Sequence, residues 1–507
     1  MMTNLFRHRA ITALAVTAAL VPLTAAAQEK PAPISESEVR EHIAVLASDA
    51  YEGRAPGTSG ETKTLDYLAR TWAGYGLVSG TNDAAHPWFQ PVGLVERKPY
   101  AHTFEARQGT KLLRIASDAV ILSGRNAAES AAGQPLFVGY GVGADGKVNT
   151  DVRGRIVLML SAEPKFEGAA KLPTRREREK LLAQAGATAV LLTAPDGAPW
   201  GSVRSALGSG SVKLSGDDVS APISGLLHAD AANALLKTGR LDLARATTLA
   251  NDPAFAPSTL PITVTLAAST SVRAFDSHNV IAKLPGTKPG SGAVLLLGHW
   301  DHFGICRSEE AADRICNGAV DNASGMAVLL TIAQRLGNGA AMERDVYFMG
   351  TTAEERGLLG AYHFADNPNV PLGQIVVALN VDTVAIAPKG APVALVGRGE
   401  SGLDAIVDQV TIASGRTVDS DTEANAFIRR QDGWALGAKG VKSIMAGGSF
   451  SDMKLLQAFL TTVYHQPDDE LTDATELGGA ADDANLHVDL VRYFADTAKY
   501  TPTPTGD

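Results

Sequence analysis

The chain has 507 residues, of which 45% are hydrophobic and 20% are charged. At roughly 150 residues per domain this length predicts two to four domains, and the hydrophobic fraction excludes wholesale disorder. The formal net charge of -10 argues against a nucleic-acid-binding protein, which usually needs a basic surface. No stretch after residue 30 contains the ~20 consecutive apolar residues of a membrane span.

Residues 1–27 have the pattern of a cleaved signal peptide. Arg7 and Arg9 form a short basic segment, residues 11–23 are apolar, and three alanines at 25–27 make a small-residue cleavage site. A membrane anchor that stays uncleaved is the alternative, and the short apolar run disfavours it. We therefore expect a periplasmic or secreted protein with no membrane span after cleavage.

Cys306 and Cys316 are the only cysteines of the chain. Export would place them in an oxidising compartment, where a disulfide between them would close a small loop and contribute very roughly 2–3 kcal/mol. Free thiols or a cysteine metal site are the rival interpretations, and the absence of a CxxC spacing weakens the metal site. The sequence favours the disulfide.

Three regions follow the signal peptide. Residues 28–116 contain two helical stretches between 34 and 80, and Ser35 with Glu38 makes a capping box at the first of them. Residues 117–268 contain short β-like runs and a basic helical stretch, which indicates a self-contained α+β module. Residues 269–507 alternate between strand-like and helical segments.

This alternation predicts an α/β domain with a mostly parallel, mixed sheet flanked by helices. Each strand-like run is short and almost continuously apolar, as expected for strands buried on both faces. The expected strands span 293–297, 346–349, 375–379 and 393–396, and the expected helices span 324–336, 360–364, 403–413 and 485–499.

Polar side chains follow the expected strands at the points where they end. In open α/β sheets, sites form outside the carboxyl ends of the strands, and histidines with carboxylates are ligands for Zn²⁺ where thiolates are absent. Two metal ions could share one carboxylate of this set. The candidate ligands are His299, Asp321, Glu355, Asp382 and His465.

Two further acidic residues have expected supporting roles. Asp301, two residues beyond His299, can hold the imidazole of that histidine. Glu354 and Glu355 are adjacent and are unlikely to do the same job. One of them can bind metal while the other takes a proton from metal-activated water.

The combined motifs resemble the M28 family of dinuclear zinc aminopeptidases. The segments that carry the resemblance are GHWDHFG, NGAVDNASG, TTAEERGLLG, NVD and YHQPDD, and EGRAPGTSG near the N-terminus matches more loosely. Residues 117–268 look like the protease-associated (PA) domain often inserted into such enzymes, with DVRGRIVL as the most telling run. The implied catalytic domain is then split into residues 28–116 and 269–507.

The resemblance implies a role for each motif residue. His299 and Asp382 would bind one zinc ion, Glu355 and His465 the other, and Asp321 would bridge the two. Asp301 would support His299, Glu354 would be the general base, and Tyr464 would steady the substrate carbonyl oxygen. His302 is expected to stay outside the ligand set.

The implied activity is hydrolysis of N-terminal residues from peptides with a free N-terminus, through water activated by two metals. A carboxypeptidase or a glutaminyl cyclase could use nearly the same metal cage, and Arg398, Arg429 and Arg430 are candidates for binding a substrate carboxylate. A non-enzymatic receptor built on a PA domain is a further alternative. It predicts lost ligands, and none is lost.

Overall fold

The computed structural model describes residues 32–502, with gaps at 170–171, 195–196, 198, 209 and 218. The expected signal peptide, 1–27, lies outside these described residues. Among the helices of the described part, none is long and apolar enough to cross a membrane.

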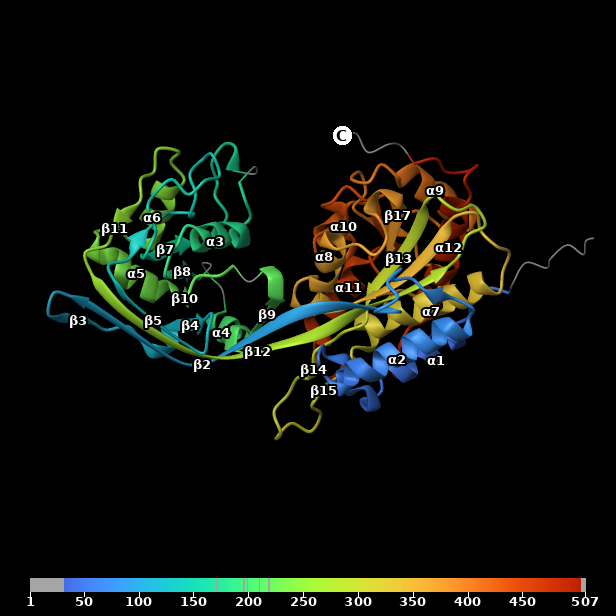
Figure 1. The fold of residues 1–507 in the computed structure, drawn as a ribbon, viewed down its shortest axis with the longest axis horizontal. Helices are drawn as coiled ribbons and strands as arrows, with labels where there is room; N and C mark the ends of the chain where they lie inside the picture. Colours follow the sequence, from blue (N-terminus) through green and yellow to red (C-terminus); the bar gives the residue numbers. More distant parts are fainter. Residues whose placement is uncertain are drawn as a thin grey trace, which may run out of the picture. The chain divides into compact units, whose positions relative to one another are not determined.

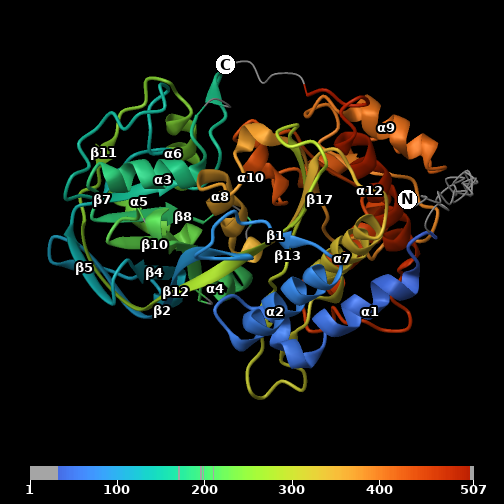
Figure 2. The ribbon, with the colours of Figure 1, turned by 45° about the vertical axis from the view of Figure 1, so that its right-hand side comes forward.

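Two helices open the described chain. They are α1 (Glu36–Leu46) and α2 (Ser59–Gly74), joined by a 3₁₀ segment at Asp49–Arg54. The expected capping box is present, because the Ser35 hydroxyl accepts from the backbone of Glu38 and the Glu38 carboxylate accepts from the backbone of Ser35. Both helices bury apolar faces against the central helix α7 (Ser324–Gly337), beside which they lie in Figure 2.

Within the described residues, the main sheet has 11 strands and is mixed. Its central strands β13 (Ala293–His299), β16 (Asp345–Thr351), β17 (Ile375–Asn380) and β19 (Ser443–Gly447) pair in parallel, in the order β19-β17-β13-β16. Antiparallel strands complete both sides, with β18 (Ala394–Val396) beside β19 and β12 (Thr263–Leu284) beside β16. The mixed α/β class predicted from the sequence is therefore confirmed.

Alternate residues of the central strands pack on opposite faces of this sheet. Val294 and Leu296 of β13 join the core formed with α1, α2, α7 and α12 (Gly478–Ala495), whereas Leu295 and Leu297 join a second core that includes α8 (Leu359–Asp366) and α10 (Gly433–Gly437). Burial on both faces explains the continuous apolar runs. The other α-helices after residue 269, in the described part of the chain, are α9 (Asp404–Ala413) and α11 (Met453–Thr462).

Two long strands were not expected from the sequence. β2 (Phe89–Gln108) and β12 pair antiparallel over nearly their whole length and run side by side in Figure 1. Shorter strands pair with them: β1 (Val78–Ser79), β3 (Lys111–Leu113), β5 (Ala128–Gly133) and β9 (Ser211–Leu214). The domain boundary expected between residues 268 and 269 falls inside β12.

A second sheet of six strands is formed between residues 120 and 259, in the order β11-β6-β7-β8-β10-β4. Two apolar cores pack against it, and one of them also contains Ala106 of β2 and Val264, Leu266 and Ala268 of β12. Its strands are β4 (Val120–Gly124), β6 (Leu136–Phe137), β7 (Ile156–Leu160), β8 (Ala189–Thr193), β10 (Ile223–Leu227) and β11 (Ser258–Thr259), and the helices of the same region are α3 (Arg175–Gln184), α4 (Trp200–Gly208), α5 (Ala229–Thr238) and α6 (Leu243–Ala250).

The expected disulfide is present. Cys306 and Cys316 are bonded, with their Cα atoms 5.8 Å apart. The bond closes a small hairpin of β14 (Gly304–Ile305) and β15 (Ile315–Cys316), in which Gly304 pairs with Cys316.

Candidate metal centre

The carboxyl ends of the parallel strands bring the candidate residues together. His299 is the last residue of β13, and Asp382 follows β17 by two residues. Glu354 and Glu355 follow β16 in a turn in which Ala353 has a φ of 52°. A left-handed conformation at a residue other than glycine costs roughly 1–2 kcal/mol, and such strain is concentrated at functional sites.

Asp321 and His465 reach the same edge from loops. Asp321 lies in the buried turn that precedes α7, and its peptide bond to Asn322 is cis. His465 follows α11 in a loop and has a φ of 60°. The structure therefore brings all five expected ligands to one edge of the sheet.

Asp321 lies between two histidines, with one carboxylate oxygen toward each. Its Oδ1 is 3.2 Å from Nε2 of His299, and its Oδ2 is 3.3 Å from Nε2 of His465. On the His299 side, Nε2 is also 3.4 Å from Oδ1 of Asp382. On the His465 side, Nε2 is 3.0 Å from Oε2 of Glu355. Two sets of three donors thus share one carboxylate.

The donor set fits divalent cations. His299, Asp321 and Asp382 offer three ligand atoms within 4.8 Å of one another. Oε1 of Glu355 and the Nε2 atoms of His302 and His465 are buried and without a hydrogen bond in the described part of the chain, and Oε1 lies 3.6 Å from Nε2 of His302. Buried polar atoms are normally hydrogen-bonded, so their convergence points to an ion that would satisfy them. Imidazole and carboxylate donors suit zinc.

The pKa values of the cluster show how strongly its charges are crowded. Burial and the neighbouring carboxylate of Asp321 raise the pKa of Glu355 to about 8. Burial also raises the pKa of Glu354. Burial would lower the pKa of His465, yet its contacts with Asp321 and Glu355 raise it to about 9. Carboxylates packed this closely repel each other, and bound cations would offset that repulsion.

Comparison with known proteins links the part of the chain that contains the site to a peptidase family. A family model described as "Peptidase family M28" matches residues 279–485, which contain every candidate ligand. Residues 279–485 belong to peptidase family M28. This confirms the enzyme class expected from the sequence, a metallopeptidase.

Three known proteins illustrate what this chain is similar to. A probable lipoprotein aminopeptidase of Mycobacterium tuberculosis is 37% identical over 128 residues, which are 25% of this chain and only 23% of that protein. An aminopeptidase from Aneurinibacillus sp. strain AM-1 has a similar fold over 94% of this chain and 97% of its own, with 19% identity and a TM-score of 0.58. A zinc aminopeptidase from Bacillus subtilis matches over 93% and 97%, with 17% identity and a TM-score of 0.46.

Asp301 contacts His299 through its main chain and Glu354 through its side chain. The Nδ1 of His299 contacts the main-chain carbonyl of Asp301 at 3.1 Å, not the carboxylate. The Asp301 carboxylate instead accepts the backbone N–H of Glu354 at 3.0 Å. Asp301 thus contacts His299 through its main chain, while its carboxylate is turned toward the next strand end.

Tyr464 and His302 flank the cluster. The Tyr464 ring stacks on His465 with centroids 3.6 Å apart, and its hydroxyl accepts a hydrogen bond of 3.2 Å from Arg430. His302 is fully buried, its Nδ1 donates to the carbonyl of Cys316 at 2.8 Å, and its Nε2 is 3.6 Å from Glu355. His302 is thus a second histidine within reach of Glu355, farther from it than His465.

Arg54 is a supporting residue to which the sequence interpretation gave no role. It is 1% exposed, and its guanidinium donates to the carbonyls of Trp300 and Gly318, each at 2.9 Å, and of Asn317. These carbonyls lie beside His299 and in the loop that leads to Asp321. Arg54 thus ties two ligand-bearing loops together, and its place in the EGRAPGTSG segment was the available signal.

Asn322 links two ligand loops in a similar way. Its Nδ2 donates to the carbonyl of Val381 at 3.1 Å, and its Oδ1 accepts the backbone N–H of Thr383 at 3.2 Å. The residues flanking Asp382 are therefore fixed to the residue that follows Asp321. This role depends on the folded path of both loops and has no local sequence signal.

Proposed function

We propose that this chain is an exported, zinc-dependent aminopeptidase that removes N-terminal residues from peptides. The observation that carries the proposal is the position of Asp321 between His299 and His465, with one carboxylate oxygen toward each histidine. His299, Asp321 and Asp382 would hold one ion, and Asp321, Glu355 and His465 the other. Two such ions supply Lewis acidity, which polarises a peptide carbonyl and acidifies water.

Glu354 is the proposed general base. Its carboxylate is 4.0 Å from Nε2 of His299, and the side chain is 13% exposed, so it borders the centre and still reaches solvent. Asp301 fixes its backbone N–H. A carboxylate held in this way can take the proton of the attacking water and return it to the leaving amine.

Tyr464 is proposed to stabilise the oxygen of the tetrahedral intermediate. Its hydroxyl accepts from the cationic Arg430, so its own proton is left to donate toward substrate. Preorganised donors of this kind stabilise developing negative charge.

The preference for a free N-terminus follows from the charge of the centre. Glu354, Glu355, Asp321 and Asp382 surround it. Two bound ions would offset most of this charge, and the carboxylate oxygens that the ions leave free would accept hydrogen bonds from a cationic α-amino group. Of the arginines considered for a substrate carboxylate, Arg398 is paired with Asp408 at 3.0 Å, and Arg429 lies over the Trp434 ring. Arg430 is the one beside the centre.

We further propose that the six-stranded sheet and its helices are the PA-like domain, spanning 117–268, and that the protein is periplasmic or secreted. The cores of this sheet share no residue with the cores around the parallel strands, which supports the first point. The Cys306–Cys316 bond supports the second, because disulfides form and persist in oxidising compartments.

The experiment compares leucine amide with N-acetyl-leucine amide on the purified protein, with and without a zinc chelator, alongside metal analysis. We expect cleavage of the unblocked substrate only, loss of activity with the chelator, and recovery when zinc is restored. Release of C-terminal residues from acetylated peptides would instead identify a carboxypeptidase, and cyclisation of N-terminal glutamine a glutaminyl cyclase.

A further inference from the structure

A cavity of about 290 Å³ borders the candidate metal centre at Phe303. We propose that it receives the C-terminal residue of a tripeptide substrate and that Arg356 binds the free carboxylate of that residue. The proposal rests on the aminopeptidase function proposed above and deepens it, because it names a substrate class, tripeptides with a free C-terminus.

Phe303 is the wall that the cavity shares with the centre. It lines the cavity, and its ring centroid is 4.5 Å from that of His465. Gly304 and Ile305, which follow it in the hairpin closed by the disulfide, line the cavity as well. The cavity therefore begins where the group of candidate ligands around His465 ends.

Arg356 supplies a positive charge to this cavity. It is the last residue of the 3₁₀ turn Glu354–Arg356, so the proposed general base, a candidate metal ligand and this arginine are consecutive in the chain. Its guanidinium lies over the Phe303 ring, 5.0 Å from the centroid, and forms no ion pair with a described residue. A guanidinium can bind a carboxylate through two parallel hydrogen bonds.

The other charged side chains that line the cavity already have partners of opposite charge. Glu96 contacts Arg273 at 3.0 Å, and Glu52 contacts Lys63 at 3.0 Å. Arg356 is thus the charge that is left to attract a ligand, and it favours an anionic group over a cationic one.

Apolar side chains form much of the remaining lining. They come from separate segments of the chain and are Ala55, Pro56, Val212, Phe275 and Ile305. An apolar last residue of the peptide could pack against them, and water screens a charge less strongly beside such a surface. The volume is close to the lower limit of about 300 Å³ for small-ligand pockets, which suits one residue better than a longer segment.

The distances indicate the length of the peptide. The Phe303 ring lies 4.5 Å from the His465 ring and 5.0 Å from the Arg356 guanidinium. An extended residue spans about 3.3–3.6 Å, so the two residues that follow a peptide bond held at the metal centre span about 7 Å. A tripeptide cleaved at its first peptide bond can therefore bring its carboxylate within hydrogen-bonding reach of Arg356.

The test compares hydrolysis of leucyl-glycyl-phenylalanine with that of its C-terminal amide by the zinc-loaded protein. We expect kcat/KM to be higher for the acid by about tenfold or more, since a hydrogen bond between charged groups is lost in the amide. The difference should lie in KM, because the carboxylate is remote from the reacting bond. Arg356→Met should remove the difference, and Arg356→Lys should keep part of it, since lysine retains the charge without the paired donors.

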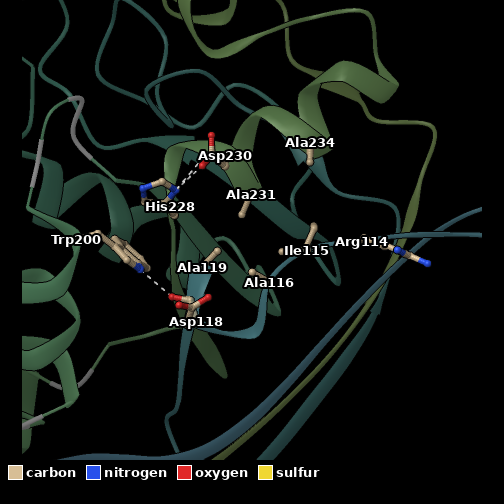
Figure 3. A pocket seen from close by; sticks show the side chains of 10 residues that line it. All are labelled: Arg114, Ile115, Ala116, Asp118, Ala119, Trp200, His228, Asp230, Ala231 and Ala234. Atoms are coloured by element: carbon tan, nitrogen blue, oxygen red, sulfur yellow. Dashed lines mark hydrogen bonds and ion pairs between the residues drawn. The ribbon is translucent and has the colours of Figure 1, made fainter.

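Arg114→Met is the matched control. Figure 3 shows Arg114 at the edge of a smaller pocket of about 260 Å³, which is lined by residues in the region of the second sheet and shares none of them with the cavity at Phe303. This variant should keep the wild-type ratio of acid to amide hydrolysis.

A pair of isoleucines tests the apolar lining. Ile305 is 58% exposed and lines the cavity, whereas Ile412 on α9 is 66% exposed and does not. Ile305→Asp should raise KM for the acid more than for the amide, because the new carboxylate repels that of the substrate. Ile412→Asp should change neither value.

Two results would overturn the proposal while leaving the aminopeptidase function in place, provided that leucine amide is still cleaved. They are equal kcat/KM for acid and amide, and a difference between them that Arg356→Met leaves intact. Higher kcat/KM for leucyl-glycyl-lysine amide than for leucyl-glycyl-phenylalanine would also overturn it and would indicate a cationic side chain bound by Glu52 and Glu96. Failure of the wild type to cleave leucine amide would overturn both proposals together.

Discussion

Asp469 holds Asp321 through the main chain: its carboxylate accepts the backbone N–H of Asp321 at 3.0 Å. The same carboxylate accepts the N–H of Val320 at 2.9 Å, so both oxygens serve the turn that carries the shared candidate ligand. Burial raises the pKa of Asp469 to about 7, against the lowering effect of these two bonds. The turn that carries this candidate ligand thus depends on a residue four positions beyond His465.

Asp469→Asn should weaken metal binding without removing a ligand. The amide nitrogen cannot accept a hydrogen bond, so one backbone N–H would lose its partner at a cost of about 1–3 kcal/mol. We expect metal affinity to fall about 10–100-fold, as for other residues that orient ligands. Zinc titration and denaturant unfolding measure the two effects, and the exposed neighbour Asp468→Asn serves as the control.

Arg54→Lys should destabilise the protein although it keeps the charge. A lysine cannot reproduce the planar arrangement of donors, so at least one of the carbonyls of Trp300, Asn317 and Gly318 would lose its partner. We expect a loss of about 2–4 kcal/mol in the free energy of unfolding. Arg40→Lys is the matched control, because Arg40 donates to the carbonyls of Thr472 and Thr475 near the surface. Equal effects of the two substitutions would contradict the role of Arg54.

Glu354→Gln and Glu355→Gln should have different consequences. Removal of the general base should lower turnover about 100-fold or more while metal content stays at the wild-type level. Glu355→Gln should instead lower metal content, since it removes a proposed ligand. Metal analysis of both variants beside their turnover distinguishes them, and loss of metal in Glu354→Gln would reverse the two roles.

His465→Ala and His302→Ala test which histidine binds the second proposed zinc ion together with Asp321 and Glu355. His465 approaches Asp321 at 3.3 Å and Glu355 at 3.0 Å, whereas Nε2 of His302 is 3.6 Å from Glu355. We expect zinc content to fall from two to one per chain in His465→Ala and to stay at two in His302→Ala. The opposite pattern would assign the site to His302.

His42 should make the protein less stable in acid. Burial lowers its pKa from 6.5 to about 4, and the ring lies between Tyr67 and Tyr75, 2.6 and 3.2 Å from their hydroxyls. Between pH 6.5 and about 4 the unfolded chain binds a proton at His42 more readily than the folded protein does. The stability contributed by neutral His42 is therefore complete above pH 6.5 and is lost as pH falls toward 4. The loss is at most about 3 kcal/mol.

The measurement is the free energy of unfolding of the wild type minus that of His42→Gln across this pH range. The subtraction cancels acid effects common to both proteins, including loss of metal. A difference that does not decrease toward low pH would show that His42 titrates normally.

The parallel strands and the candidate ligands could be predicted from the sequence because each carries a local signal. β13, β16 and β17 are buried on both faces and read as apolar runs, and His299 and Asp382 follow such runs directly. The strand β19 was missed, because Ser443 and Gly447 leave only three apolar residues between them. β2 and β12 were missed as well, since long stretches of both strands are not buried.

The contacts that position the ligands could not be predicted, because they depend on backbone paths between distant segments. Arg54 and Trp300 are 246 residues apart, and Asp469 and Asp321 are 148 apart. The direction of the Asp301 carboxylate depends on the turn at Ala353. Alanine gives no sequence signal for the left-handed backbone conformation found there. Residue identity indicated the chemistry, whereas long-range packing determined which atom makes each contact.

The pairing of β2 with β12 also has a consequence for how such a chain can evolve. Arg97 on the outgoing strand pairs with Val272 on the returning strand, so the chain leaves the neighbourhood of the parallel strands and comes back to it at adjacent positions. A short turn joining neighbouring partners could replace the whole intervening segment while the order β19-β17-β13-β16 remains intact. Acquisition or loss of that segment would therefore leave the arrangement of the parallel strands that carry the candidate ligands unchanged.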